Sequence, residues 1–150
     1  MTTAAAAGTK VYFEDVQVGQ EIPKLVKNPS TQQLVHWAAG SGDFYQIHYD
    51  QDFAKSTGLN GIIVHGALKH AFLGQLLWDW VAPSGGRIKK WGVSYRGMDY
   101  PAQELTCRGV ITAKRQEHGE HLVDLEIWTE NPAGQKTSPG TATVALPARG

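Results

Sequence analysis

The sequence predicts an α+β fold in which an antiparallel sheet wraps around one long buried helix. The first observation is the segment from Gly66 to Val81, where apolar residues cover most of the circumference that a helix would present. The second is the C-terminal half, where apolar and polar residues alternate as they do in a strand with one buried face. Because the helical segments precede a run of strands instead of alternating with them, the order indicates α+β.

The chain begins with MTTAAAAGTK, which is small and polar and has no basic segment followed by an apolar core. We therefore expect residues 1–10 to be a disordered tail rather than a signal peptide, and residues 11–150 to form a single domain. In the stretch EDVQVGQEIP, Val16 and Ile22 flank a turn at Gly19. This pattern predicts a short strand entering the fold.

Two shorter helices are predicted before the long one. Ser30 or Thr31 can cap the first, because a side-chain oxygen there accepts a bond from an unpaired N–H group of the first turn. Gly40 is expected to end this helix. Asp50 can cap a second, short helix, which the glycines of TGLNG end. Between the two helices, residues 41–50 (SGDFYQIHYD) are predicted to form a loop.

Four strands are predicted after the long helix, in the segments RIKKWGVSYRGM, LTCRGVITAK, HLVDLEIWT and GTATVALP. In the third segment, Val123, Leu125 and Ile127 occupy every second position. The residues that follow each of them, of which Trp128 is the last, would lie on the opposite face. The stretches QEHGE and NPAGQ supply the turns on either side of this third segment. Consecutive strands joined by short turns indicate an antiparallel sheet.

Composition excludes several classes of function. With 14 Lys+Arg against 14 Asp+Glu the formal charge is zero, so nothing suggests a nucleic-acid or anionic-membrane partner. The longest apolar run, ALKHAFLGQLLWDWV, includes Lys69 and Asp79 and is too short and too polar to span a bilayer. Cys107 is the single cysteine, so one chain offers neither a disulfide framework nor a cysteine-rich metal site. We expect a cytoplasmic protein.

Asp43 and His48 are the first candidates for chemistry. They lie five residues apart in the predicted loop, where a carboxylate and a neutral imidazole can divide acid and base work near neutral pH. Gly42 lets the backbone bend so that both side chains can face one point. The spacing is equally that of two polar loop residues, since Asp after Gly is common in turns.

The stretch GIIVHG leads into the long helix and supplies a second candidate feature. Gly66 stands where the helix begins, and unpaired N–H groups with the helix dipole favour negative charge there. Such an end can stabilise an oxyanion on a carbonyl group. Alternatively, Gly66 only allows a tight turn into the helix. For His65, a core position is favoured over a direct chemical role.

The region 41–77 as a whole resembles the signature of the MaoC-like, (R)-specific enoyl-CoA hydratase family. The family pattern runs S-G-D-x-N-P-[ILV]-H-x-D, then an Ala about six residues after the His, then I-V-H-G. The chain matches it without a gap at eleven positions: Ser41, Gly42, Asp43, Ile47, His48, Asp50, Ala54, Ile63, Val64, His65 and Gly66. Agreement at so many fixed separations identifies the chain as a member of the family.

The resemblance implies a hot-dog fold, in which an antiparallel sheet wraps a long helix and dimerises with a second copy. It also implies that Asp43 and His48 are the catalytic pair, holding a water between them, and that the Gly66 N–H is the oxyanion donor. The substrate would be a trans-2-enoyl thioester of CoA or of an acyl-carrier protein, hydrated to the (R)-3-hydroxyacyl thioester or formed from it by dehydration. No metal and no cofactor other than the CoA of the substrate is expected, and the setting would be fatty acid metabolism.

The chain departs from the family where Tyr45 and Gln46 replace Asn-Pro. Tyr45 is bulkier and Gln46 more flexible than the residues they replace, so these two, with His65, are candidates for shaping the substrate site. The region DWVAPSGGRIKKWGVSYRGMDYP also resembles small MaoC-like subunits of heteromeric hydratases for steroid side-chain thioesters. Gly74 stands where the family carries a small hydroxyl residue, which suggests close packing or room for an acyl chain.

Several alternatives remain open at this level. The chain could be a subunit of a heteromeric hydratase for bulky or branched acyl-CoA, or a non-catalytic subunit that binds acyl thioesters. A hot-dog thioesterase fits the motif less well. A homodimer is expected, with a higher assembly or a heteromer with another MaoC-like chain as alternatives. Which of Asp43 and His48 acts as the base is left undecided, because coupled groups share their titration.

Overall fold

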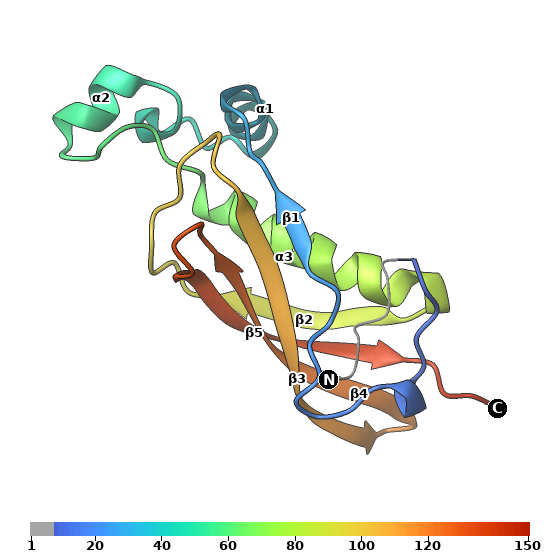
Figure 1. The fold of residues 1–150 in the computed structure, drawn as a ribbon. Coiled ribbons are helices and arrows are strands. Elements are labelled where there is room, and N and C mark those ends of the chain that lie inside the picture. Colours follow the sequence, from blue (N-terminus) through green and yellow to red (C-terminus); the bar gives the residue numbers. More distant parts are fainter. Residues whose placement is uncertain (1–7) are drawn as a thin grey trace.

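The computed structural model describes residues 8–150, in which a five-stranded antiparallel sheet curls around a long helix (Figure 1). The strands lie in the order β1-β3-β4-β5-β2. The α-helices and strands are α1 (Thr31–Ser41), α2 (Gln51–Ser56), α3 (Gly66–Val81), β1 (Leu25–Lys27), β2 (Arg87–Val93), β3 (Leu105–Glu117), β4 (Glu120–Glu130) and β5 (Lys136–Leu146). Short 3-10 helices occupy Phe13–Asp15 (η1), Gln46–His48 (η2) and Ala82–Ser84 (η3). The predicted α+β architecture is confirmed.

Helix α3 has the predicted bounds and supplies much of the core. Eight of its side chains are buried, namely Leu68, Lys69, Phe72, Leu73, Leu76, Leu77, Trp80 and Val81. Its burial is not complete around the circumference, because the side chain of Trp78 is 56% exposed. At Gly74, an added Cβ would lie 3.1 Å from the Trp91 ring of β2, so close packing explains the missing side chain.

The sheet turns its predicted inner face towards α3. Val123, Leu125 and Ile127 of β4 are at most 1% exposed and belong to the core. The opposite face is less open than expected, since Trp128 is only 7% exposed. The Lys136 ammonium lies 4.0 Å from the centre of its ring, and such long charged side chains cover apolar surface with their stems.

The N-terminal strand expected around Gly19 is not formed. The turn at Gly19 is present with a φ of +87°. Backbone hydrogen bonds join residues 19–22 to β3, but the pairing amounts to an isolated bridge between Glu21 and Val110. The first strand is instead β1, which pairs with the start of β3. Because the turn at Gly19 interrupts the stretch, its contact with β3 covers too few residues for a strand.

The first helix begins as predicted and ends later than predicted. The Ser30 Oγ accepts a hydrogen bond from the Gln33 N–H at 3.1 Å, which caps α1. The helix continues through Gly40 to Ser41, and Gly42 ends it in the left-handed conformation with a φ of +80°. The expectation that Gly40 ends the helix is therefore wrong.

Residues 31–56, comprising α1, η2 and α2, project beyond the sheet near the first turn of α3 (Figure 1). We call this segment the overhang. The Asp50 Oδ1 accepts from the Phe53 N–H at 3.0 Å and caps α2 as predicted. Residues 61–65 then return the chain to α3 as irregular backbone instead of the strand-like run that their composition indicates. The overhang and the start of α3 thus bring the motif residues together.

The predicted tail at residues 1–10 falls mainly on residues 1–7, which lie outside the described part of the chain. The division into a tail and a single domain therefore stays a prediction. Across residues 8–150, none of the helices combines the length and the apolar character that crossing a membrane requires. Cys107 is a core residue of β3, and burial raises the pKa of its thiol to about 12, which makes it a poor nucleophile.

Candidate active site

Asp43 is held by hydrogen bonds within the turn that follows α1. Its backbone N–H donates to the Ser41 Oγ at 3.2 Å, and its Oδ1 accepts from the Tyr45 N–H at 3.3 Å. These contacts direct the second carboxylate oxygen, Oδ2, towards His48. The Asp43 side chain is 47% exposed, so it is within reach of solvent and of a ligand.

His48 lies in η2 and is almost buried, with 7% of its surface exposed. Its Nδ1 lies 2.8 Å from the Ile63 carbonyl oxygen, which can only accept. The Nδ1 therefore carries the proton, and in the neutral ring the Nε2 carries a lone pair. The Nε2 lies 3.8 Å from the Asp43 Oδ2, too far for a direct hydrogen bond. One water molecule can bond to both atoms across this gap.

His65 is fully buried directly behind this pair. Its ring stacks on His48 with centroids 3.8 Å apart and an interplanar angle of 21°. Its Nε2 donates to the Asp43 backbone oxygen at 3.3 Å, while its Nδ1 has no partner in the described residues. Burial, and next the neighbouring His48, lower the pKa of His65 below its usual 6.5, so the ring stays neutral at neutral pH.

Asp43, His48 and His65 also raise the question of a metal. Each offers one ligand atom, and these three atoms lie within 4.8 Å of one another. The two imidazole rings are stacked nearly parallel, however, so their in-plane lone pairs run side by side and do not converge on one ion. The arrangement suits proton transfer better than metal binding.

The first turn of α3 faces the same place. Its backbone ladder begins with the bond from the Lys69 N–H to the His65 oxygen at 3.2 Å, so the N–H of Gly66 precedes the ladder and has no helical partner. A cleft of about 270 Å³ is lined here by His48, Ile63, Val64, Gly66, Lys69, Tyr95, Arg96, Gly97 and Met98. His48 and the candidate oxyanion donor Gly66 thus share one cleft, while Asp43 is not among the residues that line it.

The two residues that depart from the family motif are both exposed. Tyr45 is 53% exposed, and its ring meets those of His48 and Phe53 edge-on with centroids 6.4 and 6.0 Å apart. Gln46 is exposed at the start of η2. Neither is among the residues that line the cleft. Tyr45 therefore lies beside His48, outside the residues that form the cleft.

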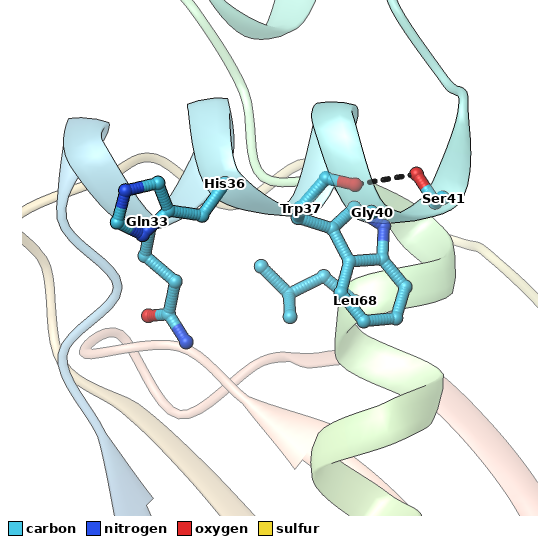
Figure 2. Close-up of a pocket in the computed structure, with 6 residues that line it drawn as sticks. All are labelled: Gln33, His36, Trp37, Gly40, Ser41 and Leu68. Carbon is cyan, nitrogen blue, oxygen red and sulfur yellow. Dashed lines mark hydrogen bonds between the residues drawn. The ribbon is translucent and has the colours of Figure 1, made fainter.

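A second cavity of about 500 Å³ lies between α1 and the first turn of α3 (Figure 2). It is lined by Gln33, His36, Trp37, Gly40, Ser41 and Leu68. The Ser41 hydroxyl, whose oxygen also accepts from the Asp43 N–H, donates to the Trp37 backbone oxygen at 2.6 Å (Figure 2). The wall of this cavity is therefore continuous with the loop that carries Asp43.

Sequence reasoning missed a buried ion pair beside the cleft. The Lys69 Nζ lies 2.9 Å from the Asp99 Oδ2, and the two residues are only 2% and 5% exposed. A lysine within an otherwise apolar helical run is a signal for such a pair, but its partner is 30 residues further along and carries no motif. Arg87 and Lys89 of β2 bond to Glu120 and lie beyond the end of α3, away from the site.

Comparison with known proteins identifies the family of the chain. The model of the MaoC like domain family matches residues 3–130. A curated relative from Rhodospirillum rubrum, named (R)-specific enoyl-CoA hydratase, is 30% identical over 93% of the chain and 94% of its own length. Another, the 3-oxo-4,17-pregnadiene-20-carboxyl-CoA hydratase beta subunit of Mycobacterium tuberculosis, is 27% identical over 88% of the chain and 96% of its own length.

Among solved structures, an (R)-hydratase from A. caviae involved in PHA biosynthesis superimposes with a TM-score of 0.80. The superposition covers 89% of the chain and 99% of that structure at 26% identity. This likeness confirms the hot-dog fold that the sequence resemblance implies. Because the family model spans most of the chain and the fold agrees over nearly its whole length, the chain belongs to the MaoC-like domain family.

Proposed function

We propose that the chain is an enzyme that hydrates trans-2-enoyl thioesters to (R)-3-hydroxyacyl thioesters, or catalyses the reverse dehydration. The observation that carries the proposal is the pair of Asp43 and His48, whose facing oxygen and nitrogen are 3.8 Å apart. Family membership and relatives named as hydratases support it. Because the bond from His48 Nδ1 to the Ile63 oxygen leaves the Nε2 as an acceptor, a water between the pair is ready to lose a proton.

In the hydration direction, the water oxygen bonds to the β-carbon while its proton passes to the pair. The π electrons move towards the thioester carbonyl, where negative charge develops on the oxygen. The N–H of Gly66, at the positive end of α3, would donate to that oxygen and lower the energy of the enolate. The α-carbon then takes a proton from the pair, which returns the site to its starting state without any redox step.

The substrate we propose is a thioester of CoA or of an acyl-carrier protein, with CoA present only as part of the substrate. No further cofactor is included, because the thioester carbonyl itself accepts the electrons that the addition displaces. A cytoplasmic location and a place in fatty acid metabolism complete the proposal. The location fits a chain whose single cysteine, Cys107, is a free, buried thiol.

The test is the loss of enoyl-thioester absorbance with purified protein, using crotonyl-CoA beside a longer and a branched enoyl-CoA. Asp43→Asn and His48→Ala are each expected to lower kcat by about 100-fold or more, since acid–base groups contribute on that order. Asp52→Asn and His118→Ala change the same residue types at exposed positions outside the site and should leave kcat unchanged. A folded wild-type protein that hydrates none of the three thioesters would contradict the proposal.

A second candidate is a subunit of a heteromeric hydratase for bulky, steroid-type or branched acyl-CoA. The relative from M. tuberculosis, which is a beta subunit, and the bulky Tyr45 beside His48 favour it. Under this alternative the isolated chain is inactive and recovers activity with a second MaoC-like chain. A non-catalytic subunit that only binds acyl thioesters would instead give a complex whose activity survives Asp43→Asn.

A further inference from the structure

We propose that Lys69 and Asp99 are positioning residues, which fix His48 in the orientation that turns its Nε2 towards Asp43. They do so by holding segment 95–99, which we call the strap, against the first turns of α3. The geometric part of the proposal stands by itself, and its consequence for turnover rests on the proposed function. Neither residue is among the eleven positions at which the chain matches the family pattern.

The first link is the ion pair itself. The Lys69 Nζ donates to the Asp99 Oδ2 at 2.9 Å and to the Gly97 backbone oxygen at 2.8 Å, so one ammonium group bonds to the strap at two places. Both charged side chains are almost fully buried. Removing two charges from water is unfavourable, and apolar replacements of such pairs are often as stable or more stable. The gain from this pair therefore lies in the geometry it imposes.

The second link is a single peptide unit between Ile63 and Val64. Its N–H, on Val64, donates to the Asp99 backbone oxygen at 2.8 Å, and its carbonyl, on Ile63, accepts from the His48 Nδ1 at 2.8 Å. A peptide unit is planar and rigid, so its N–H and its carbonyl turn together. If the Asp99 oxygen moved, the peptide could rotate, and the bond that sets the tautomer and direction of His48 would weaken.

The other end of the strap is held by the sheet. The N–H groups of Arg96 and Gly97 both donate to the Thr137 oxygen of β5 at 2.9 Å. The Tyr95 ring rests on Gly66, where an added Cβ would lie 3.0 Å from it. The ion pair is therefore the side-chain tie that joins the strap to α3, on the side where the strap reaches the peptide unit behind His48.

The direct test is the tautomer of His48, followed by the imidazole ¹⁵N resonances of the folded protein. In the wild type we expect one set of signals with the proton on Nδ1. In Lys69→Met we expect a mixture of tautomers, with the protein still folded as judged by its circular dichroism. This measurement requires no substrate and no turnover, so it distinguishes failure of this inference from failure of the proposed function.

Turnover supplies the second readout. Lys69→Met is expected to lower kcat by about tenfold to 100-fold, with KM within about threefold of the wild type, because misplacing a catalytic group affects the chemical step. The matched control is Lys136→Met, which removes the exposed ion pair with Glu126 on the sheet and should change neither kcat nor the His48 signals. If Lys69→Met did not fold, the cause would be the buried Asp99 carboxylate, which has lost its partner.

The double variant Lys69→Met/Asp99→Leu covers that case, because it buries no unpaired charge and is expected to fold. It keeps the Asp99 backbone oxygen but removes both bonds from Nζ to the strap. We expect the mixed tautomer and the lowered kcat in this variant as well. A folded double variant with the wild-type tautomer and the wild-type kcat would overturn the proposal.

Discussion

His65, directly behind the candidate pair, links the stability of the protein to pH. Because its pKa is lowered below 6.5 by burial, the unfolded chain binds a proton more readily than the folded one. Above the pKa that His65 has in the unfolded chain, the ring is neutral in both states and the protein has its full stability. Stability is lost as the pH falls through 6.5 towards the lower folded pKa. Mild acid should therefore lower the free energy of unfolding of the protein.

Urea unfolding at about pH 7.5 and about pH 5.5 gives the free energy of unfolding at each pH and tests this prediction. In His65→Gln, whose amide can replace the Nε2 donor, the free energy of unfolding should change less between the two pH values than in the wild type. His118→Gln serves as the control, because that side chain is 91% exposed. Equal pH dependence in His65→Gln and the wild type would contradict the assignment of a buried neutral ring.

At the residue scale the motif was sufficient to predict the candidate pair and Gly66, because these residues lie within a short stretch of sequence with fixed spacing. The structure brings Asp43 and His48 together and places His65, for which a core position was favoured, fully buried behind them. The catalytic roles of the pair stay a prediction. The pair of Lys69 and Asp99 could not be predicted in the same way. Its partners meet only because β2 returns the chain from the far end of α3 to its start.

At the scale of elements, two glycines show opposite constraints on the backbone. Gly40 lies inside α1 with open space where a Cβ would be, whereas a Cβ at Gly140 of β5 would lie 2.0 Å from the Gly92 backbone oxygen. Gly40→Ala should raise the free energy of unfolding by up to about 1 kcal/mol, since Gly is the poorer helix former. Gly140→Ala should lower it by at least about 1–3 kcal/mol through overpacking.

Chemical denaturation of the two alanine variants beside the wild type checks both signs. The comparison is matched, because each variant adds the same methyl group and neither glycine has a positive φ. If Gly140→Ala were as stable as the wild type, the close approach of β2 and β5 described here would be wrong. A loss of stability in Gly40→Ala would instead argue that α1 ends before that residue.

The elements that periodicity predicted well are those with many pairing or packing partners. The strands β3, β4 and β5 each have long neighbours, so the alternation of their side chains is enforced along their length. The three-residue β1 and the bridge at Glu21 each pair with only a small part of β3, which no local pattern reveals. The end of a helix is also difficult to predict from a local pattern. Gly40 and Gly42 both resemble stop signals, and only the left-handed backbone at Gly42 distinguishes them.

At the scale of the whole molecule, β2 forms an open edge of the sheet with exposed aromatic residues beside it. Trp91 of β2 is 38% exposed, and Trp78 of α3 is 56% exposed. Open edges and exposed apolar residues are usually covered by a partner, so we predict a homodimer that buries this face. Sedimentation or light scattering should give about twice the 16.4 kDa mass of the chain.

Trp78→Glu and Trp91→Glu should each shift the protein towards the monomer, while Val18→Glu, at another exposed apolar position, should not. A wild-type monomer would contradict the homodimer and favour a heteromer with another MaoC-like chain.

Sequence alone could indicate that some partner is needed, since an open sheet with an apolar helix exposes much surface. It could not reveal which edge is open, because that depends on the order of the strands.

The overhang and the sheet divide two tasks between them. Among residues 8–150 no strand includes any part of the overhang, and the long pairings that support the fold lie in β3, β4 and β5 (Figure 1). Asp43 and His48, together with the departures Tyr45 and Gln46, are all carried by the overhang. Under the proposed function, we expect substitutions at exposed positions of the overhang, such as Tyr45 and Gln46, to change substrate choice while leaving the strand pairing of the sheet intact. Because the site and the sheet are separate, the protein can acquire new substrates through changes in the overhang, and no prior increase in its folding stability is required.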